Sequence, residues 1–140
     1  YEILRCLVGS EMCIRDSTNT GAAFAVGTDY PVVCLDPFQT IYAAVTRKDA
    51  DGRISGQNPW EVIDMATVLK GYTYGAAYVY QAEDRTGSIE EGKCANLIVL
   101  DQNLFTIDPE KIPDTKVVWN IFEGQTIYDR LNNLAGASGI

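Results

Sequence analysis

The sequence predicts an α/β chain whose second part is all β, and three observations support this. The short apolar run 22–26 is typical of a strand buried on both faces of a parallel sheet. Helical patterns follow it and continue to Asp84. After Asp84 the segments become extended and rich in Ile, Val and Leu. We therefore expect one buried strand, then helices, then an antiparallel β region.

Residues 1–17 precede this regular pattern and fit neither a signal peptide nor a clean amphipathic helix. Their string CLVGSEMCIRDS resembles the translated remnant of a sequencing adapter, as found at the ends of metagenomic contigs. We therefore expect residues 1–17 to be non-native, and we exclude them from the fold prediction. The alternative is an unusual but genuine N-terminal strand.

A first helix is predicted after the apolar run, with Asp36 as its N-cap and Pro37 at its first position. Arg47 and Lys48 close it, where positive charge suits the helix dipole. Apolar residues recur at helical spacing and predict one buried face, formed by Phe38, Ile41, Tyr42 and Val45.

A second helix is predicted to begin at Asn58 and Pro59, and a third to cover residues 73–81. Four tyrosines lie in 72–80, where we expect ordinary aromatic packing with surface hydroxyls rather than a stacking platform. The spacing of the second helix predicts a buried face formed by Trp60, Ile63, Ala66 and Leu69.

Three segments beyond Asp84 are strand-like, namely 88–89, Leu97–Leu100 and Val117–Phe122. Glu123 and Gly124 form a two-residue turn that joins the last of these to a strand at 125–128, which predicts a hairpin. The tail 131–140 is small and polar enough to be loose.

Composition excludes several classes of protein. The 140 residues carry a net charge of −8, which argues against nucleic acid or an anionic membrane as a partner. No apolar run approaches the roughly 20 residues of a transmembrane helix. The scattered cysteines form no C-x-x-C pair and favour a reducing, cytoplasmic compartment. The chain has no histidine, so it cannot by itself build a hydrolytic zinc site of the usual imidazole type.

Three single residues can also be interpreted from the sequence. Cys34 could be mistaken for a nucleophile, but without a histidine to activate it we expect a buried structural thiol. Trp60 and Trp119 are expected in the core.

Four blocks, in the same order, resemble one family. They are GTDYPV at 27–32, AAVTR at 43–47, GSIEEGKCANLIVLD at 87–101, and the pair DTKVV at 114–118 with FEGQTIY at 122–128. The chain is thereby similar to the C-terminal third of the amidohydrolase family 3 enzymes, the group that contains N-substituted formamide deformylase. Asn96 is a departure, because the family usually has Asp there. We expect it to make turn or strand-edge hydrogen bonds.

The resemblance implies a fold and a site. Residues 18–84 would form the C-terminal end of a metal-dependent hydrolase (β/α) TIM barrel, with 22–27 as its last strand. Residues 85–130 would supply strands of a composite β-sandwich. Active sites of such barrels lie at the C-terminal ends of the strands, where Thr28 and Asp29 fall. Asp29 would lie at a divalent metal, expected to be zinc, and carry protons of the hydrolytic water. From its residues alone, Asp29 could equally cap the turn before Pro31.

The implied function is hydrolysis of non-peptide carbon–nitrogen bonds, such as amides, in small molecules. Most metal ligands, including a His-x-His pair, are absent, which fits truncation, so this chain alone is expected to be inactive. Arg47 could reach substrate, although pairing with Asp49 or Asp51 is at least as good an interpretation. Substrate and oligomeric state stay open. The alternatives are a non-catalytic β-rich binding module, or a deaminase or cyclic-amide hydrolase of the same superfamily.

Overall fold

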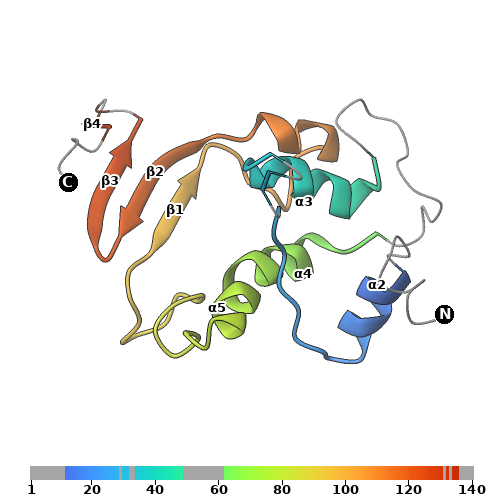
Figure 1. The fold of residues 1–140 in the computed structure, drawn as a ribbon. Coiled ribbons are helices and arrows are strands. Elements are labelled where there is room, and N and C mark those ends of the chain that lie inside the picture. Colours follow the sequence, from blue (N-terminus) through green and yellow to red (C-terminus); the bar gives the residue numbers. More distant parts are fainter. Residues whose placement is uncertain are drawn as a thin grey trace.

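The computed structural model describes residues 12–28, 30–31, 34–48, 62–130, 132 and 134–135. Helices lie on one side of the molecule and an antiparallel sheet on the other (Figure 1). The elements are, in chain order, α2 (Met12–Asn19), α3 (Pro37–Thr46), α4 (Met65–Lys70), the π-helix η1 (Gly71–Gly75), α5 (Ala76–Val79), β1 (Leu97–Leu100), the 3-10 helix η2 (Pro109–Asp114), β2 (Val117–Phe122), β3 (Gln125–Asp129) and β4 (Leu134–Ala135).

Helix α2 lies partly within the segment that we expected to be foreign to the protein. Gly21, with φ at +80°, follows the helix, and its N–H donates to the Thr18 carbonyl at 3.0 Å. Ala22 N–H donates to the Ser17 carbonyl at 3.2 Å, which joins the helix to the segment 22–28. That residues 1–17 are non-native stays a prediction.

Helix α3 confirms the expected first helix. The Asp36 carboxylate accepts a hydrogen bond from Phe38 N–H at 2.9 Å, and Pro37 is the first helical residue. The helix ends at Arg47, which adopts a left-handed conformation and donates its N–H to the Ala43 carbonyl at 2.8 Å. The predicted buried face is also correct, since it holds Phe38, Ile41 and Tyr42 in the core with Val45 packed beside them.

The second helix starts later than predicted. Asn58, Pro59 and Trp60 lie outside the described residues, but 62–64 are not helical and Asp64 is the N-cap of α4. The Asp64 carboxylate accepts from Thr67 N–H at 2.9 Å and from the Thr67 hydroxyl at 2.5 Å. A side chain that satisfies free N–H groups in this way starts a helix locally.

The predicted buried face is correct in part, because Ile63 lies in the core and Leu69 packs against it. Val68 is 0% exposed, whereas Ala66, predicted for the buried face, is exposed. Elements α4, η1 and α5 follow one another without a break. The prediction of a separate third helix that begins at residue 73 is therefore wrong. A π-helical turn widens the helix without ending it, and neither Gly71 nor Gly75 interrupts it.

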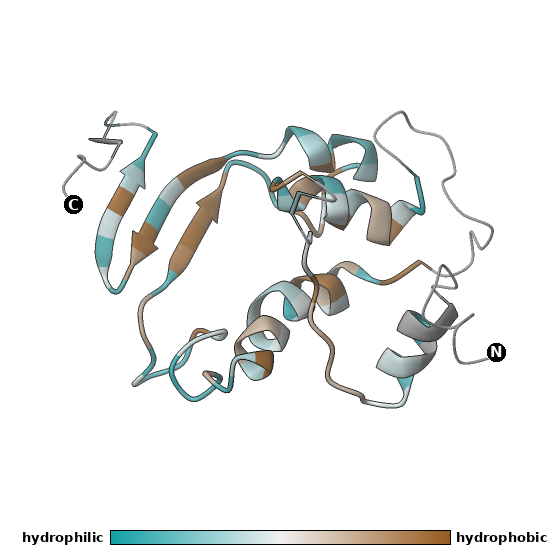
Figure 2. Cartoon of the chain, viewed as in Figure 1, coloured by the Kyte–Doolittle hydropathy of each residue, from teal (hydrophilic) through white to brown (hydrophobic). Residues whose placement is uncertain are grey.

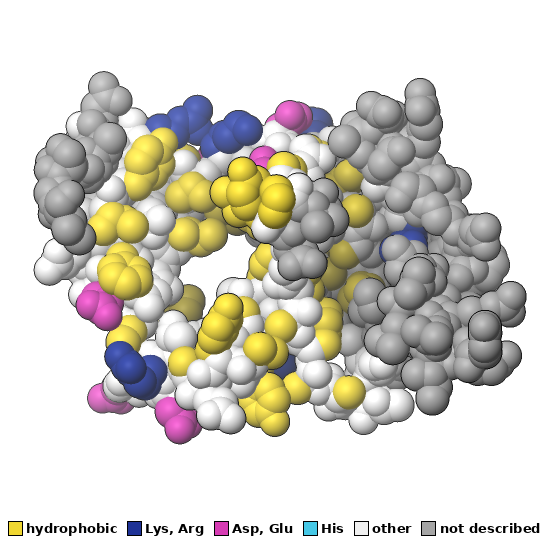
Figure 3. Space-filling view, viewed as in Figure 1, with side chains coloured by type: hydrophobic (Ala, Val, Ile, Leu, Met, Phe, Trp, Pro, Cys, Tyr) yellow, Lys and Arg dark blue, Asp and Glu magenta, His cyan; other side chains and the backbone are white. Residues whose placement is uncertain are grey.

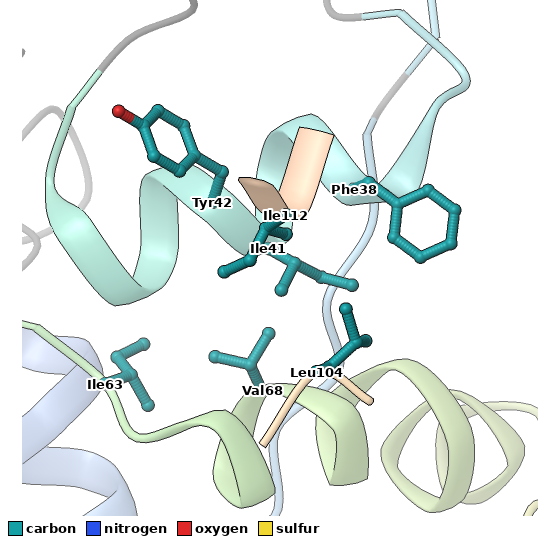
Figure 4. Close-up of a cluster of buried hydrophobic side chains, with 7 residues drawn as sticks. All are labelled: Phe38, Ile41, Tyr42, Ile63, Val68, Leu104 and Ile112. Carbon is teal, nitrogen blue, oxygen red and sulfur yellow. The ribbon is translucent and has the colours of Figure 1, made fainter. Parts of the chain in front are cut away.

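The core lies between α3, α4 and the connection from β1 to β2 (Figure 4). Leu104 and Ile112 come from that connection. It packs against the helices and completes the buried cluster. The buried cluster consists of Phe38, Ile41, Tyr42, Ile63, Val68, Leu104 and Ile112.

The sheet has the order β1-β2-β3-β4, with every neighbouring pair antiparallel. Strands β1 and β2 have the predicted bounds, and β3 extends to Asp129. Glu123 and Gly124 both have positive φ, 49° and 79°, as a type I′ hairpin turn requires. Residues 88–89 form no strand, whereas β4 lies in the tail that we expected to be loose. Its pairing of Ala135 with Tyr128 extends the hairpin.

Strand β1 is apolar, whereas β2 and β3 mix apolar with polar residues (Figure 2). Apolar side chains are exposed on all three strands, among them Ile98, Phe122 and Ile127. Trp119 is 41% exposed, so its predicted place in the core is wrong. Its indole N–H donates instead to the Thr126 hydroxyl on the neighbouring strand at 3.0 Å. A sheet face becomes a core only when a second layer packs on it, and the described residues supply none here.

The apolar run 22–28 forms no strand among the described residues and runs along the α4–η1–α5 helix (Figure 1). A parallel strand is defined by the ladders to its neighbours, and the described part of the chain places no strand beside it. The prediction of a strand at 22–26 is therefore wrong for this chain as described. The apolar run is nevertheless packed, because Phe24 and Val26 lie against Gly71.

Candidate functional site

The candidate site lies at the end of segment 22–28. Thr28 is described, and so are Tyr30 and Pro31, but Asp29 lies outside the described residues. Its role as catalytic residue and metal ligand is therefore untested by the structure. What the structure does show is how the segment leading to Asp29 is held.

Gly71 and Gly75 of the helix contact segment 22–28 closely. Val26 N–H donates to the Gly71 carbonyl at 3.2 Å. Gly71 and Gly75 are both buried, one turn apart on the same side of the helix. A Cβ on Gly75 would lie 2.0 Å from the Phe24 carbonyl oxygen, so only glycine permits this approach. Sequence reasoning missed these residues, although their four-residue spacing within a helical pattern was a signal.

The segment after the site leads into α3 through Cys34, Leu35 and Asp36. Cys34 is exposed, so the expectation of a buried structural thiol is wrong. The described residues place no apolar layer over it, and burial of a single thiol depends on what lies opposite. It has no histidine partner anywhere in the sequence, so the argument against a nucleophile still holds.

Two hydroxyls meet beside this segment, between α3 and η1. Thr40 Oγ1 and Tyr72 Oη are both buried, with no hydrogen-bond partner among the described residues. Burial raises the pKa of the Tyr72 phenol, the neighbouring Thr40 hydroxyl opposes that rise, and the Asp36 carboxylate adds to it. Tyr72 thus departs from the expected packing with a surface hydroxyl, while Tyr74 and Tyr78 stack as expected with ring centroids 6.3 Å apart.

Arg47 and Asn96 were singled out from the sequence and meet different outcomes. The predicted partners of Arg47, Asp49 and Asp51, lie outside the described residues, so its role stays a prediction. Asn96 behaves as expected. Its side-chain oxygen accepts from Glu123 N–H at 2.8 Å, and its amide nitrogen donates to the Thr86 hydroxyl at 3.4 Å. Asn96 therefore holds the hairpin turn.

The metal-binding capacity of the chain is small. The described residues contain no group of three or more His, Cys, Asp or Glu side chains able to hold an ion. The carboxylate of Asp29 is a chemically suitable ligand for a divalent ion, but one carboxylate is not a site. The remaining ligands would have to come from outside the described residues.

A hollow lies between the helices and the sheet, away from the candidate site. Its volume is about 820 Å³, and its lining includes Lys70 and Tyr74 from the helix and Leu97 and Ile98 from β1. Figure 3 shows the opening, with hydrophobic side chains around it. Thr28 does not line it, so it is not part of the site predicted from the sequence.

No helix in the described part of the chain is long and apolar enough to cross a membrane.

Comparison with known proteins identifies relatives of this chain. Residues 12–128 match a family model described as the amidohydrolase family. A putative amidohydrolase, YtcJ, of Bacillus subtilis (strain 168) is 31% identical over 111 residues, which are 79% of this chain and 21% of that protein. N-substituted formamide deformylase of Arthrobacter pascens is 26% identical over 117 residues, 84% of this chain and 21% of that protein. The chain thus spans about a fifth of the length of these relatives.

Solved structures share the fold. An amidohydrolase from Thermotoga maritima MSB8 superposes with a TM-score of 0.60 at 24% identity, covering 86% of this chain and 26% of that one. An adenosine deaminase from Xanthomonas campestris with bound zinc gives 0.61 at 23% identity, covering 86% and 29%. The predicted fold class is therefore confirmed.

Proposed function

Because the chain belongs to the amidohydrolase family, we propose that the complete protein hydrolyses non-peptide carbon–nitrogen bonds of small, amide-type molecules. The observation that carries this proposal is the family match over residues 12–128, which includes the Gly27-Thr28-Asp29 motif. The name of one relative, N-substituted formamide deformylase, supports an amide as the substrate class.

The chemistry requires an activated water and a proton carrier. An amide resists water because the nucleophile is weak and the leaving nitrogen is a poor anion. A bound divalent ion, for which we propose zinc, would lower the pKa of its water to about 7. The similar adenosine deaminase from Xanthomonas campestris holds bound zinc, which supports that choice of ion.

We assign the proton transfer to Asp29. A carboxylate next to the attacking water can accept its proton and deliver it to the departing nitrogen, which contributes roughly 100- to 10,000-fold in rate. Asp29 has this chemistry and directly follows the apolar segment held by Gly71 and Gly75. It would also contribute one of the ligands to the metal.

The 140 residues alone are expected to lack this activity. They contain no histidine, and their described residues form no three-ligand group. Assaying the purified chain with added zinc checks this expectation, and measurable metal-dependent turnover would contradict it.

The decisive experiment uses the complete gene. Asp29→Asn in the complete enzyme keeps the shape of the side chain but removes the base. We expect kcat to fall by at least about 100-fold with metal content and fold unchanged. Asp36→Asn is the matched control, because Asn also caps a helix and Asp36 is an N-cap rather than a catalytic residue. A metal-loaded, folded Asp29→Asn enzyme with near-normal kcat would rule out Asp29 as the proton carrier.

The substrate panel separates the remaining alternatives. N-substituted formamides, cyclic amides and amino-substituted heterocycles are tested side by side. Release of ammonia from the amino-substituted heterocycles identifies a deaminase. A complete protein that turns over none of them, but binds a ligand, would favour the non-catalytic module instead.

A further inference from the structure

We propose that Gly71 and Gly75 are positioning residues for the reaction, because they fix the segment that carries Asp29. The inference rests on the proposed role of Asp29, but its structural part can be tested without any activity. Neither glycine is expected to touch substrate, metal or the reacting atoms.

Gly75 sets the distance between the helix and the segment. A Cβ at this position would lie 2.0 Å from the Phe24 carbonyl oxygen and 3.0 Å from the Phe24 carbonyl carbon. These are backbone atoms, so no side-chain rotation relieves the overlap. Any larger residue at position 75 must push the backbone of the segment away from the helix.

Gly71 fixes the segment nearer to the site. Within the described part of the chain, the backbone hydrogen bond made by residues 23–28 runs from Val26 N–H to the Gly71 carbonyl, at 3.2 Å. A Cβ on Gly71 would lie 2.7 Å from Val26 Cγ2 and 3.0 Å from Phe24 Cζ. The contact at position 71 therefore involves side chains only. Shortening Val26 removes the nearest atom, and the Phe24 ring then needs to shift by only a few tenths of an ångström.

Helix stability alone gives no reason for these glycines. Alanine in a helix interior is more stable than glycine, and both residues lie within a π-helical turn, a feature common at functional positions. The cost of glycine here is offset by the contact that it permits with segment 22–28. Val26 precedes Asp29 by only three residues, so a displacement of Val26 displaces Asp29 with it.

The test is a set of variants in the complete enzyme. Gly71→Ala and Gly75→Ala are each expected to lower kcat by about 10- to 100-fold, because a misplacement of the order of 1 Å has that effect on a catalytic group. KM is expected to change by no more than about twofold, since substrate binding does not depend on the proton carrier. The control is Thr73→Ala, an exposed position of the same turn, which should keep normal kcat.

A double variant separates positioning from general damage. Val26→Ala removes the atom nearest to a Cβ on residue 71, so Gly71→Ala with Val26→Ala should return to within about threefold of Val26→Ala alone. The same Val26→Ala change should not rescue Gly75→Ala, whose overlap is with backbone. If Gly71→Ala fails to fold, restoration by Val26→Ala supports the proposal, and failure to restore overturns it.

Hydrogen exchange gives the readout that is independent of catalysis. Peptides covering residues 22–28 should exchange at least about tenfold faster in Gly71→Ala and Gly75→Ala than in the parent or in Thr73→Ala. Unchanged exchange in both glycine variants would overturn the inference, whatever the activity. If the parent enzyme shows no carbon–nitrogen hydrolysis but exchange responds as expected, the proposed function fails while the placement of the segment stands.

Discussion

The helical region buries most of its apolar side chains, whereas the sheet leaves many of its apolar side chains exposed. In the helical region, formed by α3, α4, η1 and the connection that carries Leu104 and Ile112, the apolar stripes meet in one buried cluster. In the sheet, Ile98 is 56% exposed and its neighbour Val99 is 44% exposed. Consecutive residues of a strand point to opposite faces, so each face of β1 carries an exposed apolar residue, although Leu100 at its end packs against the helical core.

The difference shows what each region needs from elsewhere. Helices can cover one another, and a single returning connection completes their core. A sheet with two apolar faces needs a layer on each, and isolated apolar patches of this kind mark interaction surfaces. The sheet is therefore the part of this chain whose stability depends on further polypeptide.

The largest expected effect concerns the sheet in the isolated chain. The purified 140 residues should self-associate as concentration rises and should fold poorly, because the bare sheet faces pair with one another. Replacing Ile98 and Val99 by Glu should shift the chain toward the monomer, as measured by sedimentation velocity. Gln125→Glu, at an exposed polar position on β3, is the control. A soluble monomer with a cooperative melt would contradict the claim that the sheet of the isolated chain lacks a covering layer.

The second prediction compares one residue from each region. Ile112 is 1% exposed in the helical core, so Ile112→Ala should lower the free energy of unfolding of that region by about 2–5 kcal/mol. Ile98→Ala should lower the free energy of unfolding of the helical region by less than about 0.5 kcal/mol, because Ile98 lies on the sheet outside the buried cluster. Native-state hydrogen exchange of the α3 amides in the complete protein measures both. Equal effects would mean that the sheet is as well covered as the helical core.

A smaller effect is expected at the start of α4. Asp64→Ala removes the acceptor for the Thr67 N–H and hydroxyl and should cost about 0.5–2 kcal/mol. Asp64→Asn keeps an acceptor and should cost clearly less. The test is again exchange at α4 amides, and an equal loss in the two variants would exclude capping as the cause.

The smallest effect is a pH dependence at the contact between α3 and η2. Glu110 accepts from Tyr42 Oη at 2.8 Å and pairs with Lys48. The hydrogen bond from Lys48, followed by that from Tyr42, lowers the pKa of Glu110 below its ordinary 4.5. Its contribution to stability is therefore present above pH 4.5 and is lost as pH falls through the lowered pKa.

At high pH the same contact weakens again. The pKa of Lys48 is raised, mainly by its hydrogen bond to Glu110, and burial raises the pKa of Tyr42. Stability from both groups should be lost as pH rises above about 10. Glu110→Gln should flatten the acidic part of the stability profile. The measurement is thermal melting of the complete protein from about pH 3 to 6, a range that spans the ordinary pKa of glutamate. An unchanged profile would show that this contact does not contribute to the pH dependence of stability.

Local signals were sufficient where one residue acts on its own neighbours. Asp36 with Pro37 predicted the start of α3, and Glu123 with Gly124 predicted the hairpin turn, because caps and turns depend on a few consecutive residues. The same holds for the bounds of β1 and β2. The order of the four motif blocks was enough to predict the family.

The tertiary structure alone decided which apolar residues are buried and what holds the site. Val68 rather than Ala66 faces the core, and Trp119 and Cys34 are exposed, because burial depends on what another segment places opposite each side chain. The close approach of Phe24 and Val26 to Gly71 and Gly75 joins residues more than forty positions apart, a contact that periodicity along either segment does not contain. Asp29 could be chosen from its motif, but a catalytic site is made by groups from several segments, and only their packing brings them together.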